Sequence, residues 1–398
     1  MTDAVLVLNS GSSSIKFGLF DISNGEPAPK CKGLLDEQEE APRLFVTDPS
    51  GKVLYEKRQP EGEHEDNRLF VGIFDWIENN LGERKLAAVG HRVVHGGRDF
   101  SGPVAVTDKI LEALDALTPL APLHQPRCLE PIRAIKSLRP NLMQVACFDT
   151  AFHHTLAPPV SRFAIPSRFE ALGIRRYGFH GLSFEYIASR LAALSSELAQ
   201  ARAVVAHLGN GASLCAMRQG KSVDTTMGLT PLDGLVMGTR CGAIDPGVLL
   251  YLLKERKMPP DEVQHLLYEK SGLLGVSGLS ADMRVLLASR QASACDAIDL
   301  FTFRVASEVA AMANTFEGLD CLIFTGGIGE HASEIRQRIC DRLAWLGLAL
   351  DASANERGQQ NIAAADSRIE VLIIPTSEEM TIARHCAAVL ANSAAAQV

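Results

Sequence analysis

Residues 5–17 read VLVLNSGSSSIKF, an apolar run of four residues that gives way abruptly to small polar residues. A short apolar run bounded by such residues is typical of a buried β-strand, here followed by a turn into a second strand. Small residues let a backbone approach a phosphate closely, so that its N–H groups, its hydroxyls and a lysine can contact the phosphate oxygens. The P-loop pattern Gly-x-x-x-x-Gly-Lys is absent, and a plain serine-rich turn is an equally good interpretation of this segment alone.

Four further apolar runs, at residues 145–148, 204–206, 322–324 and 371–374, also end at polar or glycine residues. Helical patterns separate them. Apolar residues recur at steps of three and four over residues 298–316 and 335–346, and a third helix over residues 187–194 has Ser183 as its expected N-cap. Residues 24–68 predict edge strands and surface loops. Strands that alternate with helices predict an α/β architecture, in which ligands bind at the carboxyl ends of the strands.

The chain repeats a short pattern at an offset of 200 residues. Residues 8–13 read LNSGSS and residues 208–213 read LGNGAS, each after an apolar strand. A length of 398 residues suits two domains. The repeat therefore suggests a duplicated domain with a polar hairpin at the same corner of each copy.

Composition excludes several classes of protein. Apolar residues make up 46% of the chain and the net charge is −8, so binding to nucleic acid is not expected. The nine cysteines contain no C-x-x-C pair and predict reduced thiols in a cytoplasmic protein. No apolar run reaches the ~18 residues of a membrane helix, and the N-terminus lacks the positive start of a signal peptide.

Two arginines lie beside glycines. Residues 90–97 read GHRVVHGG and contain Arg92, and residues 237–242 read MGTRCG and contain Arg240. The planar fork of arginine suits carboxylate and phosphoryl oxygens, although a surface salt bridge is the common role of a single arginine. His91 and His95 would bind a metal as a pair only on a helix, which the flanking glycines argue against.

Two further polar residues stand at apolar strand or helix ends. Asp149 follows the strand at residues 145–148, where a carboxylate is costly unless it is paired or bound to a metal. His180 lies between glycines in residues 175–181, RRYGFHG, ahead of a helix. A structural role for His180 remains open at this point.

Two glycine-rich segments complete the pattern. Residues 207–213, HLGNGAS, predict a hairpin, and residues 325–330, TGGIGE, lie between a strand and a helix. Glycines at a helix start allow a nucleotide to pass closely, but the spacing is not the G-x-G-x-x-G of dinucleotide-binding proteins. An ordinary strand-to-helix turn is the alternative.

Taken together and in this order, these segments resemble the acetate kinase family, within the larger group of sugar kinases and actin-like ATPases. The resemblance covers almost the whole chain. It implies the reversible, Mg²⁺-dependent phosphorylation of acetate by ATP, through direct in-line transfer, to give acetyl phosphate and ADP. The implied fold is α/β, with two actin-like ATPase (ribonuclease H-like) domains, each a central mixed sheet flanked by helices, and a catalytic cleft between them.

The family's roles transfer to matching positions of this sequence. The resemblance implies four catalytic residues, namely Asp149, Arg92, His180 and Arg240. It implies substrate contacts by Arg92, Val94, Leu123, Phe179 and Pro231. It implies ATP contacts by Ser12, Ser14, Lys16, His207, Leu208, Gly209, Asn210, Gly211, Asp282, Met283, Arg284, Gly326, Gly327, Ile328, Gly329 and Glu330. Asn9 and Glu378 match the positions associated with Mg²⁺, or Mn²⁺ in its place, and the adjacent Glu379 is the alternative carboxylate.

The resemblance also implies domain bounds and partners. Residues 1–150 with 385–398 would form the N-terminal domain on the substrate and phosphate side, and residues 151–384 the nucleotide-binding domain. A homodimer is implied. Gln125, Cys241 and Ala243 depart from the usual family residues Asn, Ser and Asp. Cys241 and Ala243 flank Arg240 and put the details of its orientation in doubt, but not the reaction class.

Acetate is already ionised at pH 7, so its activation needs no general base. We therefore hypothesise that Asp149 orients Mg²⁺ or its waters. A propionate or butyrate kinase is the nearest alternative, because one methylene changes binding by only ~1–3 kcal/mol. The bulk of Val94 favours acetate. An actin-like ATPase that phosphorylates no metabolite is the alternative from another class.

Overall fold

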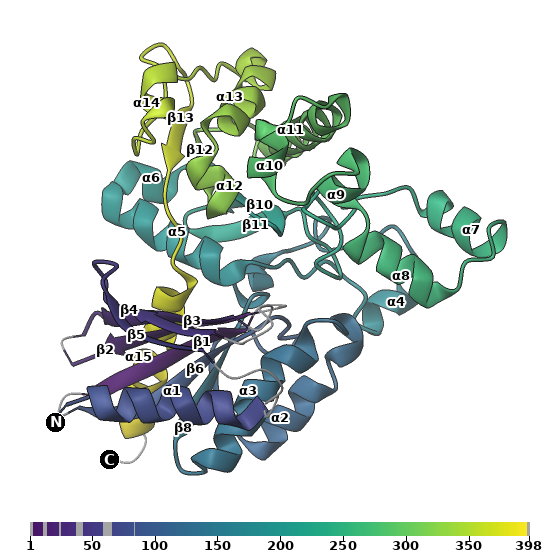
Figure 1. Cartoon of the computed structure of the whole chain (residues 1–398). Coiled ribbons are helices and arrows are strands. Elements are labelled where there is room, and N and C mark those ends of the chain that lie inside the picture. Colours follow the sequence, from purple (N-terminus) through teal and green to yellow (C-terminus); the bar gives the residue numbers. More distant parts are fainter. Residues whose placement is uncertain are drawn as a thin grey trace. The chain divides into compact units, whose positions relative to one another are not determined.

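The structure is a computed structural model that describes residues 3–10, 14–23, 25–36, 43–58, 66–82 and 84–395. It divides into two compact units, one formed by Met1–Ala151 with Ser377–Val398 and the other by Phe152–Thr376. Each unit has its own sheet and its own helices (Figure 1). The segment that returns to the first unit begins at Ser377 and not at residue 385, because the whole of helix α15 (Glu378–Ala395) packs on the first sheet.

The first unit is built on an eight-stranded sheet with the order β5-β4-β3-β2-β1-β6-β8-β7. Its strands are β1 (Asp3–Ser10), β2 (Ser14–Asp21), β3 (Ala28–Asp36), β4 (Arg43–Thr47), β5 (Val53–Arg58), β6 (Lys85–Val93), β7 (Val104–Ala105) and β8 (Met143–Phe148). Strands β1 and β2 are antiparallel, whereas β1, β6 and β8 run parallel. The carboxyl ends of these three parallel strands therefore meet at one edge of the sheet.

Helices cover both faces of this sheet. Val89 of β6 belongs to the apolar cluster that contains Phe74 and Ile77 of helix α1 (Asp66–Asn80). The next residue, Gly90, points to the other face, where a Cβ atom would lie 2.5 Å from side-chain atoms of Ile382 and Cys386 in α15. Helices α2 (Asp108–Asp115) and α3 (Gln125–Leu138) complete the unit.

The second unit is built on a five-stranded sheet with the order β11-β10-β9-β12-β13. Its strands are β9 (Arg202–Leu208), β10 (Ala212–Arg218), β11 (Lys221–Thr225), β12 (Cys321–Thr325) and β13 (Glu370–Ile373). An antiparallel hairpin, β9–β10, is followed by two parallel strands, as in the order β3-β2-β1-β6-β8 of the first unit. The sequence repeat at residues 8–13 and 208–213 falls at the two corresponding hairpins, as expected for a duplicated domain.

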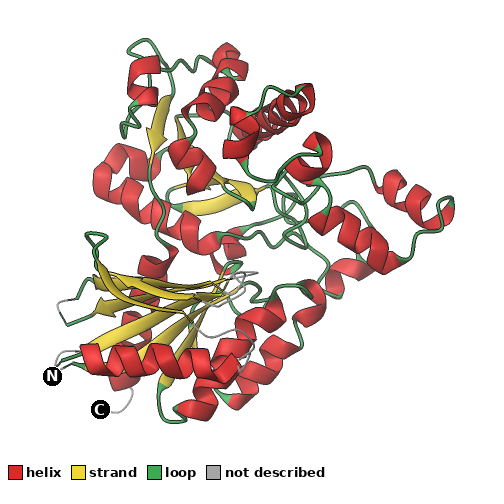
Figure 2. Cartoon of the chain, viewed as in Figure 1, coloured by secondary structure: helices red, strands yellow, loops and turns green. Residues whose placement is uncertain are grey.

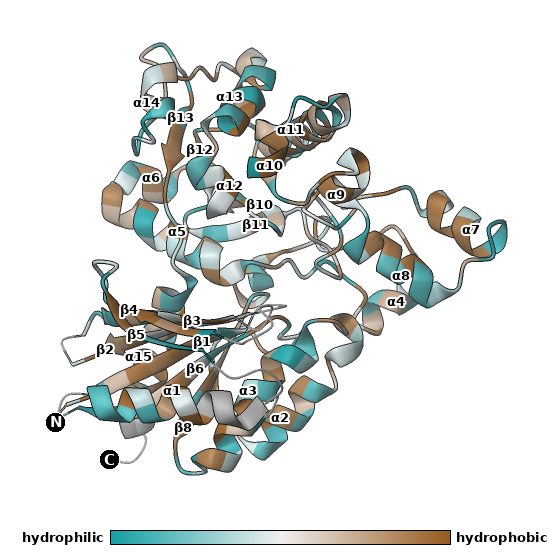
Figure 3. Cartoon of the chain, viewed as in Figure 1, coloured by the Kyte–Doolittle hydropathy of each residue, from teal (hydrophilic) through white to brown (hydrophobic). Residues whose placement is uncertain are grey.

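Helices of very different length surround the second sheet (Figure 2). They are α4 (Arg168–Ala171), α5 (Gly181–Leu194), α6 (Ser196–Gln200), α7 (Pro246–Lys254), α8 (Pro260–Glu269), α9 (Gly272–Ser277), α10 (Met283–Ala288), α11 (Ala292–Thr315), α12 (Gly326–His331), α13 (Ser333–Arg342) and α14 (Ala352–Glu356). The predicted apolar stripe on α11, including Phe301 and Val305, is buried. Figure 3 shows that apolar residues are also concentrated in the strands. The prediction of α/β architecture with a mixed sheet in each domain is confirmed.

Three local predictions are wrong. The helix expected over residues 335–346 ends at Arg342, and Ala344–Leu346 form a 3₁₀ turn because Leu346 N and Gly347 N bond to carbonyls three residues back. Ser183 is not the N-cap of α5, since that helix begins at Gly181 with His180 as its N-cap. Helix α1 begins inside the segment that was expected to hold only strands and loops. No helix among the described residues has the length and apolar character that crossing a bilayer requires.

Candidate functional site

An ion pair joins two parallel strand ends in the first unit. Strands β6 and β8 pair in register at Val93 and Phe148, so Arg92 and Asp149 emerge side by side. Arg92 Nε donates to Asp149 Oδ1 over 3.0 Å, and its Nη2 donates to Asp149 Oδ2 over 2.6 Å. Burial disfavours the guanidinium charge of Arg92, but the attraction of the Asp149 and Glu378 carboxylates is stronger than this effect. The net result is a raised pKa of Arg92. This pairing accounts for a fully buried carboxylate at position 149.

The pair extends to the predicted metal residues. Arg92 Nη1 donates to Asn9 Oδ1 over 3.3 Å, and Asn9 Nδ2 donates to Glu378 Oε2 over 2.9 Å. Asn9 is at the end of β1 and Glu378 is the first residue of α15. Burial, and then the adjacent Glu378 carboxylate, raises the pKa of Glu379. Four predicted site residues from distant parts of the chain thus form one network.

The lysine of the serine-rich segment lies beside this network. Lys16 is the partner of Asn9 in the β1–β2 register, and its exposed side chain lines a cavity of about 380 Å³ together with Glu379. Ser12 lies outside the described residues. Ser14 is described only as the first backbone position of β2.

The residues predicted for the methyl pocket belong to different units. Val94 is buried and Leu123 is exposed in the first unit, whereas Phe179 is buried in the second. Pro231, also in the second, accepts a hydrogen bond from Arg240 through its carbonyl. Their convergence on one acetate molecule stays a prediction.

One of the three departures from the family pattern has a clear structural role. Gln125 is fully buried, and its amide accepts from His95 N over 3.2 Å. The same amide donates to the carbonyls of His95 and Leu114. Gln125 therefore holds the segment after β6, and all its polar groups are satisfied.

Three side-chain nitrogen atoms, from His180, His207 and Arg240, form a ring around the β9–β10 hairpin of the second unit. A Cβ atom built at Gly211 would lie 3.3 Å from His180 Nε2 and 3.7 Å from Arg240 Nη1. At Gly209 it would lie 4.0 Å from His207 Nε2. Glycines at the tip thus leave room next to three nitrogen atoms, which suits an anion such as a phosphate group.

The two histidines of this ring are held rigidly. His180 has a left-handed backbone conformation with φ of 57°, which is uncommon outside glycine. Its Nδ1 lies 2.9 Å from Ser213 Oγ on β10. The imidazoles of His180 and His207 stack with centroids 4.4 Å apart. Backbone strain of this kind persists where the surrounding structure determines it, and it is common at functional sites.

Arg240 comes from a loop that is bonded to the same hairpin. Gly238 N donates to Asn210 O over 3.0 Å, and Arg240 Nη1 donates to Pro231 O over 3.1 Å. Cys241, one of the departures, directs its thiol to Gly242 O over 3.2 Å, and burial raises its pKa. The carbonyl of Pro231 therefore anchors the guanidinium of Arg240 in this chain.

A cavity of about 520 Å³ brings together the three predicted nucleotide segments. Its lining includes the predicted residues Gly209, Asn210, Asp282, Met283, Arg284, Gly327 and Ile328. It also includes Ala281, Leu287, His331 and Ala332, which the sequence analysis did not identify. Apolar side chains with few polar groups are typical of a small-molecule site.

Other residues predicted to contact ATP do not line this cavity. His207 and Gly211 belong to the hairpin ring, and Leu208 is buried. Gly326 has φ of 76°, and a Cβ there would lie 2.8 Å from Leu208 O. Gly329 is buried in α12. Glu330 turns back to accept from Gly326 N over 2.9 Å and so braces the start of α12.

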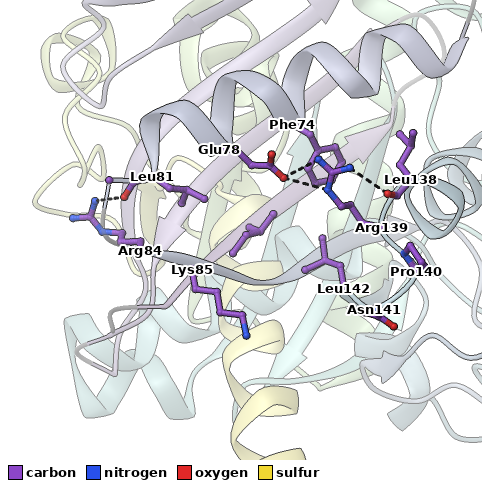
Figure 4. A pocket seen from close by; sticks show the side chains of 12 residues that line it. Phe74, Glu78, Leu81, Arg84, Lys85, Leu138, Arg139, Pro140, Asn141 and Leu142 are labelled. Carbon is purple, nitrogen blue, oxygen red and sulfur yellow. Dashed lines mark hydrogen bonds and ion pairs between the residues drawn. The ribbon is translucent and has the colours of Figure 1, made fainter.

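A further cavity, of about 460 Å³, lies at the opposite end of β6 from Arg92 (Figure 4). Arg139 donates to Glu78 and to Leu138 O there, and Arg84 donates to Leu81 O. None of the predicted site residues lines it.

Comparisons with known proteins agree on one family. Residues 4–384 match the model of the acetokinase family. An acetate kinase from Rhodopseudomonas palustris is 52% identical over 97% of this chain and 98% of its own. A propionate kinase structure from Francisella tularensis has a TM-score of 0.89 and 39% identity, covering 96% of this chain and 98% of its own. The acetate kinase structure from Porphyromonas gingivalis has a TM-score of 0.86 and 35% identity over 98% of this chain and all of its own. The chain belongs to the acetokinase family.

Proposed function

We propose that this chain transfers the γ-phosphoryl group of ATP to the carboxylate of acetate, reversibly, to give acetyl phosphate and ADP. The observation that carries the proposal is the 520 Å³ cavity, where three segments far apart in the chain meet beside the ring of nitrogen atoms around the hairpin. The near-full-length similarity to acetate kinases supports the same reaction.

Phosphoryl transfer depends on alignment and on neutralisation of charge more than on covalent chemistry. In a chain with a net charge of −8, the positive field has to be local. Arg240 and the Nε2 atoms of His180 and His207 supply donors at the hairpin. Arg92 supplies a second guanidinium in the first unit, for the acetate carboxylate or the transferring group.

Asp149 takes the role of orienting Arg92 in this proposal. We propose this role in place of the orientation of Mg²⁺ or its waters, because both carboxylate oxygens of Asp149 accept hydrogen bonds from Arg92. Acetate arrives ionised, so Asp149 has no proton to remove.

Mg²⁺ fits the residues of the first unit. Among the described residues, no three or more His, Cys, Asp or Glu side chains are grouped so that they could hold a metal ion by themselves. Mg²⁺ is usually bound by one or two carboxylates, with waters and substrate phosphates as its other ligands. Glu378, with Glu379 beside it and Asn9 hydrogen-bonded to it, would provide the carboxylate side of such a site. The ion would neutralise charge on the nucleotide phosphates.

We further propose that the protein works as a homodimer in the cytoplasm. None of the nine cysteines, all of which lie among the described residues, forms a disulfide bond, which supports a reducing compartment. Light scattering coupled to size exclusion would measure the mass of the assembly.

A hydroxamate assay tests the proposed reaction. ATP, Mg²⁺ and acetate should yield acetyl hydroxamate, and kcat/KM should be higher for acetate than for propionate or butyrate. ATP hydrolysis without any acyl hydroxamate would instead indicate an actin-like ATPase. A higher kcat/KM for propionate would reassign the substrate but not the reaction.

A further inference from the structure

Two hydroxyl groups connect His207 to the last residue of the second unit. Ser183 Oγ lies 2.9 Å from His207 Nδ1 and 2.8 Å from Thr376 Oγ1. Ser183 is fully buried, so bulk water does not compete for its hydroxyl. These residues are distant in the sequence, and neither hydroxyl belongs to the residues predicted for the site.

The proton of Ser183 decides the tautomer of the imidazole. A serine hydroxyl donates one proton, and a neutral histidine carries its proton on one ring nitrogen only. If Ser183 donates to His207 Nδ1, the ring proton is on Nε2. If Ser183 donates to Thr376, then Nδ1 has to donate to Ser183, and Nε2 is an acceptor.

The environment of Nε2 favours the first arrangement. This atom is directed to the glycine hairpin, 4.0 Å from the place of a Cβ at Gly209. Phosphate oxygens only accept hydrogen bonds, so a phosphate at the hairpin requires a proton on Nε2. A neutral ring with its proton there donates without placing a positive charge next to the imidazole of His180, whose ring is stacked 4.4 Å away. This step rests on the proposed function.

The far end of the hydroxyl chain is also fixed in place. Thr376 N donates to Glu330 Oε1 over 3.2 Å, and the same oxygen accepts from Gly326 N, the residue before Gly327 of the nucleotide cavity. The backbone of Thr376 is therefore held at the turn that borders the cavity, with its side chain in reach of Ser183. Such bracing keeps a hydrogen-bond donor in one orientation.

We propose that Ser183 and Thr376 are positioning residues for the phosphoryl-transfer reaction. Thr376 donates to Ser183, Ser183 donates to His207 Nδ1, and the imidazole is thereby held as a neutral ring with its proton on Nε2. His207 then presents a ready donor to the anion at the hairpin.

The test is a long-range ¹H–¹⁵N spectrum of the full-length protein with labelled histidine, recorded without nucleotide at a pH where His207 is neutral. A His207→Gln variant assigns the signals. We expect an unprotonated Nδ1 and a protonated Nε2 in the parent protein, and a mixture of tautomers in Ser183→Ala and Thr376→Val. Ser183→Thr should restore the single tautomer. Ser189→Ala is the matched control, because it removes a hydroxyl from the same helix, where Ser189 Oγ donates to the carbonyl of Tyr186 over 2.7 Å.

Kinetics provide the second readout. We expect kcat/KM for ATP to fall about tenfold in Ser183→Ala, with recovery in Ser183→Thr and no such fall in Ser189→Ala. A protonated Nδ1 in the parent, or an unchanged tautomer in both Ser183→Ala and Thr376→Val, would overturn the inference. Acetyl phosphate formation with the opposite tautomer would remove this inference and leave the proposed function intact. If Ser183→Ala fails to fold, Thr376→Val still tests the tautomer, because Thr376 is only half-buried and its substitution disturbs the core less.

Discussion

Replacing Asp149 by Asn tests the central pair of the first unit. The substitution keeps the size of the side chain but removes the charge. It also places an amide NH₂ group, a donor, opposite the donors of Arg92, whose Nη2 is 2.6 Å from Asp149 Oδ2 in the parent protein. Arg92 would keep one acceptor, the carbonyl oxygen of the new amide, and its bond to Asn9.

The size of the effect follows from the geometry. Two unit charges about 4 Å apart at an effective dielectric constant near 20 attract each other by about 4 kcal/mol. Removing one partner of a buried pair costs about 3–5 kcal/mol. The Arg92 side chain is 20% exposed, which favours the lower end, and the retained hydrogen bond recovers about 1 kcal/mol. We therefore expect a loss of about 2–3 kcal/mol in the free energy of unfolding of the first unit, and a fall in turnover on the order of 10²-fold.

The two tryptophans make the measurement specific. Trp76 lies in α1 and packs against the core of the first unit, whereas Trp345 is in the second unit and 70% exposed. In a Trp345→Phe background, fluorescence during urea unfolding reports on the first unit alone. An unfolding free energy within about 0.5 kcal/mol of the parent value would refute the structural role of the pair. If the turnover of the variant recovers at high Mg²⁺ concentration, Asp149 acts on Mg²⁺ or its waters instead.

Four other perturbations give distinct results. Arg240→Ala should lower kcat, with a rise of at least ~2 kcal/mol in the activation free energy, and should leave KM for acetate nearly unchanged. The hydroxamate assay measures both constants. Gly326→Ala should destabilise the second unit by about 1–3 kcal/mol and weaken nucleotide binding in calorimetry, because φ is 76° and the new Cβ would meet the β9 backbone. Burial lowers the pKa of His91 to about 4, so the folded state binds fewer protons than the unfolded state below pH ~6.5. The free energy of unfolding should therefore fall by up to about 3 kcal/mol as the pH drops from ~6.5 to about 4. His91→Gln should flatten the dependence of Tm on pH. Val94→Ala should shift the ratio of kcat/KM from acetate towards propionate by about 1 kcal/mol.

Five strands, β1, β8, β9, β12 and β13, could be predicted from sequence because each contains a short apolar run that ends at polar or glycine residues. Helix α1 could also have been found, since Ile73, Phe74 and Ile77 have helical spacing and are all buried. The charged residues around them obscured that pattern. The break of the helix after Arg342 had no comparable signal, because the apolar repeat continues through the 3₁₀ turn.

The site shows where sequence reasoning stops. Arg92 and Asp149 could each be identified as polar residues at apolar strand ends. The ion pair between them could not be predicted from sequence, since it depends on the parallel register that places Val93 beside Phe148. Ser183 had an ordinary interpretation as a helix cap. Its contact with Thr376 exists only because β13 returns the chain to the start of α5.

The five strands of the second sheet have the same order as β3-β2-β1-β6-β8 of the first sheet, and each sheet has three neighbouring parallel strand ends. In the first unit the residues that follow or end β1, β6 and β8 are joined by charges, through the Arg92–Asp149 pair. In the second, the ends of β9, β12 and β13 are joined through neutral hydroxyls and an imidazole, and through the Glu330 carboxylate that bonds to backbone N–H groups. Removing a charge is costly in the first case because its partner is left buried, whereas removing a hydroxyl in the second frees a proton to move. Asp149→Asn should therefore lower stability together with turnover, whereas Ser183→Ala should in addition change the tautomer of His207.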